Sequence, residues 1–107
     1  MKKYRVIVTP EAQSAIRESV LYIYEDSPSA AARWLQGLNA QIDTLEHFPE
    51  RCPPAREREF LEEDLRQLLF KSHRIVFHVD QPNTTVYVLH MRHAKRRATG
   101  EPEAEEP

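Results

Sequence analysis

The sequence has a single cysteine among its 107 residues and no apolar run of the ~18 residues that a membrane-spanning helix needs. Cys52 therefore has no partner for an internal disulfide, which suits a reducing compartment. The apolar stretch near the N-terminus, residues 6–8, is too short for the hydrophobic region of a secretory leader. These absences argue against a disulfide scaffold and a membrane protein. We expect a cytoplasmic protein that does not bind membranes.

Metal-binding patterns are missing as well. The five histidines and Cys52 show none of the spacings that are typical of zinc sites, so we expect neither a metal nor another cofactor. Cys52 lies in the proline-rich residues 51–54, a setting that favours a structural thiol over a catalytic nucleophile. Candidate chemistry therefore rests on histidine and arginine side chains.

The net charge of −2 conceals an uneven distribution. Residues 98–107 carry four glutamates and no lysine or arginine, and the rest of the chain has 15 basic and 13 acidic residues. Residues 66–97 hold seven of those basic residues, with Asp80 as their single acidic residue. Such a field favours an anionic partner, although it also fits a solubilising surface. We expect one domain over residues 1–97, followed by a disordered acidic tail.

A strand and a helix are predicted at the start of the chain. Residues 3–9 are rich in β-branched side chains that alternate with others, which indicates a strand. Thr9 and Pro10 then form a helix start, because threonine can cap the first turn and proline needs no N–H there. The helix should end near Asp26. Its apolar face is predicted to consist of Ala12, Ile16, Ser19, Val20 and Ile23.

Ser27 and Pro28 repeat the same helix start. Apolar residues then recur at spacings of four and three, which predicts a helix over residues 28–47 that Pro49 ends. The apolar positions are Ala31, Leu35, Leu38, Ile42 and Leu45. Because the connection to the first helix is so short, the two helices should fold back as an antiparallel hairpin.

The second half of the chain predicts three strands joined by short turns. We expect them over residues 65–70, 74–80 and 84–92, after a loop over residues 50–64. The apolar residues expected to pin this loop to the core are Phe60 and Leu61. Consecutive strands this close together form an antiparallel meander. The predicted fold class is therefore α+β, a small antiparallel sheet packed on an N-terminal helical hairpin in the order β-α-α-β-β-β.

Alternation assigns the side chains of the last two strands to two faces. In the first of these strands, Ile75, Phe77 and Val79 are expected on one face, and Arg74, Val76, His78 and Asp80 on the other. In the last strand, Val86, Val88 and His90 are expected on one face, and Tyr87, Leu89 and Met91 on the other. One face should pack on the helices, while the other can meet solvent or a ligand.

This order of elements, together with four sequence stretches, resembles the RelE/ParE family of bacterial toxins. The stretches are YRVIVTPEA (residues 4–12), DSPSAAARW (26–34), LEHFPER (45–51), and LRQLLFKSHRIVF (65–77) continued by VYVLHMRH (86–93). The resemblance extends over nearly all of residues 4–97. It implies a small cytoplasmic toxin of a type II toxin–antitoxin system, of the kind also called plasmid stabilisation proteins. It also implies growth arrest, and a cognate antitoxin protein that holds the toxin inactive.

Family members that cut messenger RNA on the ribosome attack a phosphate with the adjacent 2′-hydroxyl, which needs a base, an acid and fixed cations. The resemblance implies that Arg74 contacts the phosphate and that Arg92 supplies another cation. His90 and His93 are the candidate proton carriers. Further cations for RNA or another anion are expected from Lys71, Lys95, Arg96 and Arg97. In a plainer interpretation, Arg74 pairs with an acidic side chain and His90 is a partly buried, hydrogen-bonded residue.

Two other functions stay open beside this endoribonuclease. No aromatic residue follows Tyr87 to stack on a base, and residues 56–64 are mixed in charge and end acidic. The ParE branch of the family, which inhibits DNA gyrase, needs no such catalytic set. An inactivated toxin that only binds its antitoxin is the other possibility. In each case we expect the hairpin and the sheet to leave an apolar groove for the antitoxin.

Overall fold

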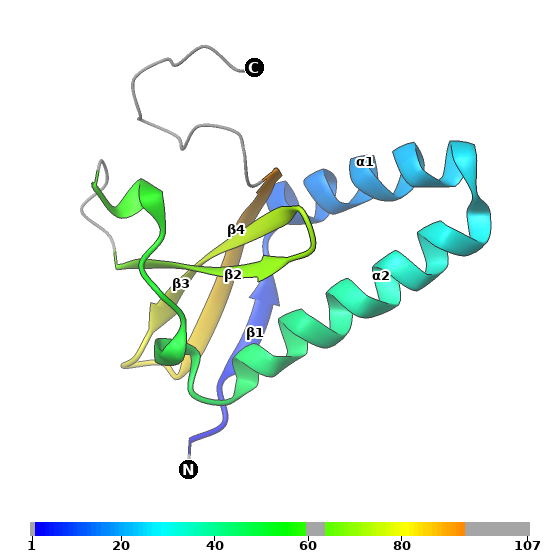
Figure 1. The fold of residues 1–107 in the computed structure, drawn as a ribbon. Helices are drawn as coiled ribbons and strands as arrows, with labels where there is room; N and C mark the ends of the chain where they lie inside the picture. The colour runs from blue at the N-terminus through cyan, green and yellow to red at the C-terminus, as the bar shows by residue number, and fades with distance from the viewer. Residues whose placement is uncertain (1, 60–63, 94–107) are drawn as a thin grey trace.

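The computed structural model describes residues 2–59 and 64–93, as two helices and a four-stranded sheet (Figure 1). The elements are β1 (Arg5–Val8), α1 (Pro10–Asp26), α2 (Pro28–Asp43), β2 (Leu65–Phe70), β3 (His73–Asp80) and β4 (Thr85–His93). Three short 3-10 helices lie between α2 and β2: η1 (Thr44–Glu46), η2 (Pro49–Arg51) and η3 (Arg56–Glu59). The predicted α+β order is confirmed. The expected acidic tail, the cations Lys95, Arg96 and Arg97, and the expected loop anchors Phe60 and Leu61 lie outside the described residues.

Both helix starts form as their sequences predict. The hydroxyl oxygen of Thr9 accepts a hydrogen bond from the backbone N–H of Ala12 at 3.3 Å, and that of Ser27 accepts one from Ala30 at 3.2 Å. Such caps typically contribute about 1 kcal/mol each. The Thr9 hydroxyl also lies 2.8 Å from the backbone oxygen of Val88. Thr9 therefore ties the start of α1 to β4.

The core lies between the two helices and one face of the sheet. Its buried members on α2 are Ala31, Trp34, Leu38 and Ile42, with Leu45 following on η1. On α1 only Ala12 is buried, while Ile16, Val20 and Ile23 are partly buried against the core. No helix among the described residues has the length and apolar character to cross a membrane.

α2 ends at Asp43, four residues before the predicted end, and the chain tightens into η1. The backbone N–H of Tyr4 donates to the carbonyl of Glu46 at 2.8 Å, so the turn after α2 is drawn toward the residues before β1. Phe48 then adopts a left-handed conformation with φ 48°, which is unusual for a bulky residue. The guanidinium of Arg51 donates to the carbonyls of Thr44, His47 and Phe48 and stabilises this turn.

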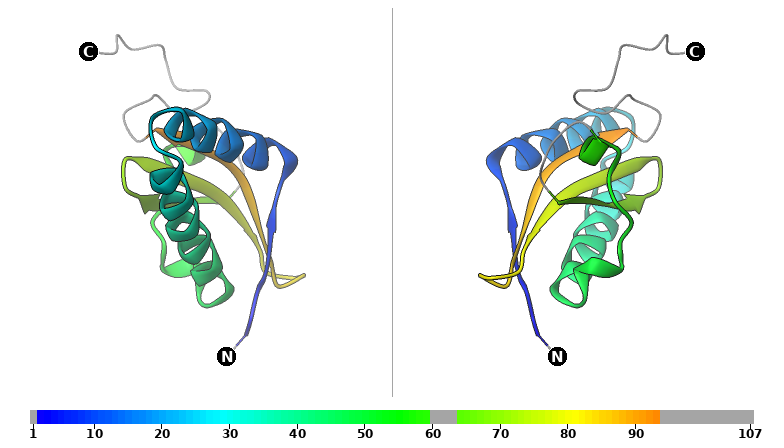
Figure 2. Two further views of the ribbon diagram at one scale, coloured as in Figure 1. Left: turned by 90° about the vertical axis from the view of Figure 1, so that its right-hand side faces the viewer. Right: turned by 90° about the vertical axis from the view of Figure 1, so that its left-hand side faces the viewer.

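The sheet has the strand order β1-β4-β3-β2. Strands β2, β3 and β4 form the predicted antiparallel meander. β1 joins β4 in parallel, from Arg5 beside Thr85 to Val8 beside Val88, so the complete sheet is mixed. Figure 2 shows β1 at the edge of the sheet next to β4. β1 pairs with β4 only as far as Val88, and α1 passes over the rest of that strand.

A β-bulge in β4 changes which side chains face the core. Val76 lies opposite His90 while Phe77 lies opposite Val88, so Leu89 is an extra residue on β4. The predicted faces are correct up to Leu89, which packs against Val76, and wrong from His90 onward. Met91 faces the main core, and His90 lies on the same face as Val76.

The segment between α2 and β2 covers part of this outer face. The backbone N–H of Ala55 donates to the carbonyl of Leu65 at 2.9 Å, and that of Gln67 donates to the carbonyl of Pro53 at 3.0 Å. Ala55 and Leu65 are buried in a small second cluster with Val76 and the partly buried Leu89. In Figure 1 the strands lie between this segment and the two helices. η3 is thereby placed over the outer face of β3 and β4.

Candidate functional site

Arg74 is fully buried on the outer face of β3 and forms a bidentate ion pair with Glu57 of η3. Its Nη1 donates to Oε1 of Glu57 at 2.7 Å, and its Nη2 donates to Oε2 at 2.8 Å. Glu57 is fully buried as well. A buried charge is tolerated when it is paired in this way, because both guanidinium and carboxylate keep charge-assisted hydrogen bonds.

Arg92 on β4 lies directly opposite Arg74 and is the second cation near this carboxylate. Its Nε is 3.9 Å from Oε2 of Glu57. Burial raises the pKa of Glu57, but the hydrogen bonds and charge of Arg74 outweigh it, and the pKa lies below its ordinary value. A hydrogen bond from the backbone of its own residue lowers it further. Glu57 is therefore ionised and offsets the repulsion between two arginines on adjacent strands.

His90 completes this cluster. Nε of Arg92 donates to Nδ1 of His90 at 3.3 Å, which makes Nδ1 an acceptor and fits a neutral ring protonated on Nε2. Burial lowers the pKa of His90 and the charge of Arg92 lowers it further, while Glu57 and Glu11 act in the opposite direction. The plainer interpretation of His90, a partly buried and hydrogen-bonded residue, therefore describes its geometry.

The phosphate contact expected of Arg74 stays a prediction. As the chain is folded, both terminal nitrogens of Arg74 are engaged by Glu57, and a phosphate reaching them would have to take the place of that carboxylate. The pairing with an acidic side chain, which the sequence left open, is present. The outer face of β3 and β4 thus brings together Arg74, His90 and Arg92, three of the four predicted catalytic residues.

The fourth, His93, lies on the face toward the helices. Its ring meets that of His73 with centroids 5.6 Å apart, and His73 in turn meets Trp34 at the same separation, both edge to face. Trp34 also meets Phe70 at 5.7 Å. Trp34 is buried, which suits a core residue better than a base-stacking platform.

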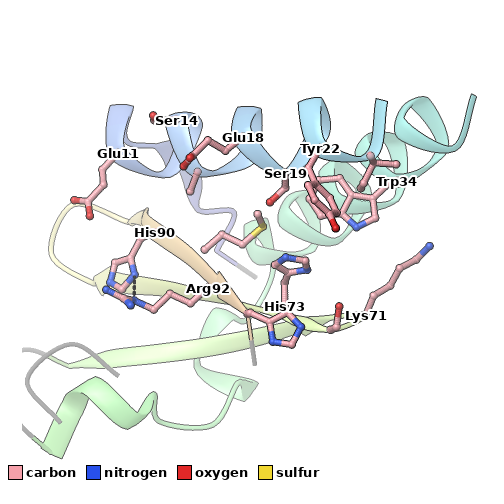
Figure 3. A pocket seen from close by; sticks show the side chains of 15 residues that line it. Glu11, Ser14, Glu18, Ser19, Tyr22, Trp34, Lys71, His73, His90 and Arg92 are labelled. Atoms are coloured by element: carbon pink, nitrogen blue, oxygen red, sulfur yellow. Dashed lines mark hydrogen bonds between the residues drawn. The ribbon is translucent and has the colours of Figure 1, made fainter. Parts of the chain in front are cut away.

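A groove of about 1140 Å³ runs between α1 and the last residues of β4 (Figure 3). α1 contributes Glu11, Ser14, Ala15, Glu18, Ser19, Tyr22 and Ile23, and the opposite wall contains Trp34, Lys71, Ser72, His73, His90, Met91, Arg92 and His93. Figure 3 shows Glu11 near His90 at one end of the groove, and Tyr22 near Trp34 at the other. Lys71, predicted to bind an anion, lies at the Trp34 end. The groove therefore combines an apolar floor with charges of both signs.

Other reactive groups offer little chemistry. Cys52 is buried, and burial raises the pKa of its thiol although Arg51 and Arg66 act in the opposite direction. A thiol of this kind is a poor nucleophile. Among residues 2–59 and 64–93, no three histidine, cysteine, aspartate or glutamate side chains are grouped so that they could hold a metal ion.

Sequence reasoning missed Glu57. It lies in the run Arg56–Glu59, where charges alternate in sign and no apolar periodicity distinguishes one glutamate from another. The signal that could have indicated a buried carboxylate lies on β3. Arg74 shares a face with the apolar Val76, and an arginine in such a position needs a carboxylate partner. Which carboxylate supplies it depends on the path of the loop.

A family model described as "ParE toxin of type II toxin-antitoxin system, parDE" matches residues 6–98. The chain belongs to the ParE toxin family. ParE-type toxins are one branch of the family that the sequence resembles, so this match confirms the resemblance and identifies the chain as a toxin of a type II toxin–antitoxin system. No curated protein sequence matches the chain.

Solved structures share the ParE fold at low sequence identity. The chromosomal ParDE system of P. aeruginosa matches with a TM-score of 0.68 and 16% identity, covering 85% of this chain and 96% of that one. The toxin–antitoxin complex RelBE2 of Mycobacterium tuberculosis matches with 0.57 and 20%, covering 87% and 93%. The archaeal RelE–RelB complex of Pyrococcus horikoshii matches with 0.53 and 17%, covering 89% and 99%. At these identities the likeness establishes the fold.

Proposed function

We propose that this ParE toxin arrests growth by binding a protein target in the cytoplasm, with DNA gyrase as the expected target, and that it does not cut messenger RNA. The observation that supports this choice is the buried ion pair of Arg74 and Glu57. RNA cleavage needs accessible cations around the reacting phosphate. Here one arginine is fully buried and its charge is neutralised by a carboxylate of the same chain.

The state of His90 supports the same choice. A general acid must be protonated near neutral pH, and a lowered pKa reduces the fraction of His90 that is protonated there. Its Nδ1 already accepts a hydrogen bond from Arg92. The cluster of Glu57, Arg74, His90 and Arg92 is, in this proposal, structural: it fixes η3 to the sheet.

We also propose that a cognate antitoxin binds the groove between α1 and β4. The similar RelBE2 and RelE–RelB structures are complexes of a toxin with its antitoxin. The groove offers apolar contacts from Trp34 and Met91, and the 79% exposed Tyr22 stands at its rim. Exposed aromatic side chains beside an apolar floor are typical anchors for a partner peptide.

The test is controlled expression in a bacterial host with DNA and protein synthesis followed by pulse labelling, together with a supercoiling assay on purified gyrase. Early loss of DNA synthesis and inhibition of supercoiling support the proposal. Early loss of protein synthesis with cleavage of messenger RNA on the ribosome would instead establish the endoribonuclease. In that case Arg74, His90, Arg92 and His93 become the residues to mutate. Absence of any arrest would leave an inactivated toxin that only binds its antitoxin.

A further inference from the structure

Two large apolar side chains lie on the solvent side of α1. The helix packs on the core through Ala12, Ile16, Val20 and Ile23. At 3.6 residues per turn, Leu21 falls on the opposite side of the helix, and Tyr24 follows it by about one turn. Leu21 is 57% exposed and Tyr24 is 55% exposed. Their neighbouring positions leave a continuous apolar area that a second protein can cover.

This area is separate from the groove between α1 and β4. The groove takes Ser19, Tyr22 and Ile23 from the second half of α1, and its lining does not include Leu21 or Tyr24. Figure 1 shows the second half of α1 projecting beyond the strands together with the start of α2. A protein that contacts the solvent side of α1 therefore does not have to enter the groove.

Two exposed charges of opposite sign flank Leu21. Arg17 lies four residues before it and Glu25 lies four residues after it, so all three share one side of the helix. Neither Arg17 nor Glu25 forms an ion pair with another residue in the described parts of the chain. We refer to Arg17, Leu21, Tyr24 and Glu25 as the Leu21 face.

The Leu21 face is complementary to itself. When two α1 helices pack antiparallel about a two-fold axis at Leu21, residues equally far before and after Leu21 lie opposite each other. Leu21 then meets Leu21 of a second copy, and Arg17 of each copy faces Glu25 of the other. A parallel arrangement would instead place like charges opposite each other. The apolar contact supplies the attraction, and the two ion pairs mainly select the orientation.

We propose that this chain forms a symmetric dimer through the Leu21 face, with the two α1 helices antiparallel. A contact made by one pair of helices is at the small end of specific interfaces, so the dimer is weak, with a dissociation constant in the micromolar range or above. Both grooves stay open in this dimer, so each copy can still bind an antitoxin. The inference depends neither on gyrase as the target nor on the groove as the antitoxin site.

The first test is sedimentation velocity of the purified full-length chain from about 10 to about 500 µM, a range that contains weak dissociation constants. Leu21→Glu places two like charges on the two-fold axis and should raise the dissociation constant on the order of tenfold or more. Leu69→Glu is the matched control, because Leu69 is 59% exposed on β2 and should dimerise as the wild type does. A wild type that stays monomeric throughout, or a Leu21→Glu variant that dimerises equally well, would overturn the proposal.

A charge exchange tests the antiparallel pairing. Arg17→Glu and Glu25→Arg each place like charges opposite each other when the variant pairs with itself, so each alone should dimerise more weakly than the wild type. In an equimolar mixture every facing pair has opposite charges. The mixed dimer should therefore form on the order of tenfold more tightly than either variant with itself. Thermal unfolding checks that both variants are folded.

Lys2→Glu is the control for net charge. It changes the charge of the chain as Arg17→Glu does, but it lies before β1, so its mixture with Glu25→Arg should not form the tighter dimer. Folded variants that show no preference for the mixed dimer would rule out this pairing and the proposal with it. If a charge variant does not fold, the comparison of Leu21→Glu with Leu69→Glu decides.

The antitoxin is the other candidate occupant of the Leu21 face, and calorimetry with the purified antitoxin distinguishes the two. Leu21→Glu should bind the antitoxin with wild-type affinity while it fails to dimerise. If Leu21→Glu instead dimerises as the wild type does and binds the antitoxin weakly, the Leu21 face belongs to the antitoxin and the proposed dimer is wrong.

Discussion

Nδ1 of His90 accepts a hydrogen bond at 3.3 Å from Nε of Arg92, which lies two residues further along the same strand. The two side chains share a face because they are two residues apart on the strand, and the bulge at Leu89 makes that face the outer one. A protonated His90 would lose this acceptor and would meet a guanidinium instead. The neutral ring is therefore part of the folded state.

The first prediction concerns pH. The pKa of His90 is lowered in the folded chain, so below the ordinary histidine value of about 6.5 the unfolded chain binds more protons than the folded one. The stability that neutral His90 contributes is present above that value and is lost as pH falls toward the folded-state pKa. Urea unfolding at pH 7.5, 6.5 and 5.5 should show a falling free energy of unfolding. His90→Gln should flatten the decline, and an unchanged slope in that variant would contradict the assignment.

The second prediction concerns the buried ion pair. Glu57→Ala leaves the guanidinium of Arg74 buried without its carboxylate, and should lower the free energy of unfolding by about 3–5 kcal/mol. Glu46→Ala is the matched control, because Glu46 pairs with the exposed Lys3 at 3.5 Å and should cost less than about 1 kcal/mol. Urea unfolding at pH 7 measures both. Similar losses of unfolding free energy in the two variants would show that Glu57 does not form a buried ion pair with Arg74.

The third prediction concerns the groove. Tyr22 lines it and is 79% exposed, whereas Tyr24 is 55% exposed and lies outside its lining. Tyr22→Ala should weaken binding of the cognate antitoxin by about 2 kcal/mol or more, as truncation of an aromatic anchor does, and Tyr24→Ala should change it little. Calorimetry with the purified antitoxin provides the affinities, and thermal unfolding checks that both variants are folded. Equal effects of the two substitutions would place the antitoxin elsewhere.

The fourth prediction concerns the strained turn after η1. Phe48 has φ 48° and is 60% exposed, so its side chain contributes little packing while its Cβ disfavours the backbone conformation. Phe48→Gly should therefore be more stable than Phe48→Ala by roughly 0.5–1 kcal/mol, because both variants lose the ring but only glycine relieves the strain. Urea unfolding of the two variants tests this, and the glycine variant should have the higher midpoint. A more stable alanine variant would mean that the turn relaxes to another conformation.

Local signals predicted the regular elements well. Thr9 and Ser27 cap their helices through their side-chain hydroxyl groups, and the proline after each suits the first turn, so both signals are contained in neighbouring residues. The alternation of Ile75, Phe77 and Val79 likewise placed the inner face of β3 correctly. Such features depend on residues a few positions apart, so a single sequence is enough to predict them.

The features that build the candidate site depend on distant residues. The parallel pairing of β1 with β4 joins positions about eighty residues apart, and the bulge at Leu89 depends on the register between two strands. Glu57 finds Arg74 only through the path of the segment between α2 and β2. The sequence therefore named Arg74, His90 and Arg92 without indicating that they share a face or that a carboxylate lies among them.

The bulge at Leu89 also determines which side chains at the end of β4 face the core. If β4 alternated strictly without the bulge, Met91 would turn outward and the charged side chain of Arg92 would be directed at the apolar core. Removing the unpaired Leu89 itself would leave both side chains on their present faces. A loop such as residues 81–84 accepts an added or deleted residue far more easily, because no inner and outer faces are exchanged. Deletion of a residue that follows the bulge, such as Met91, should consequently be tolerated far less well than deletion of Leu89.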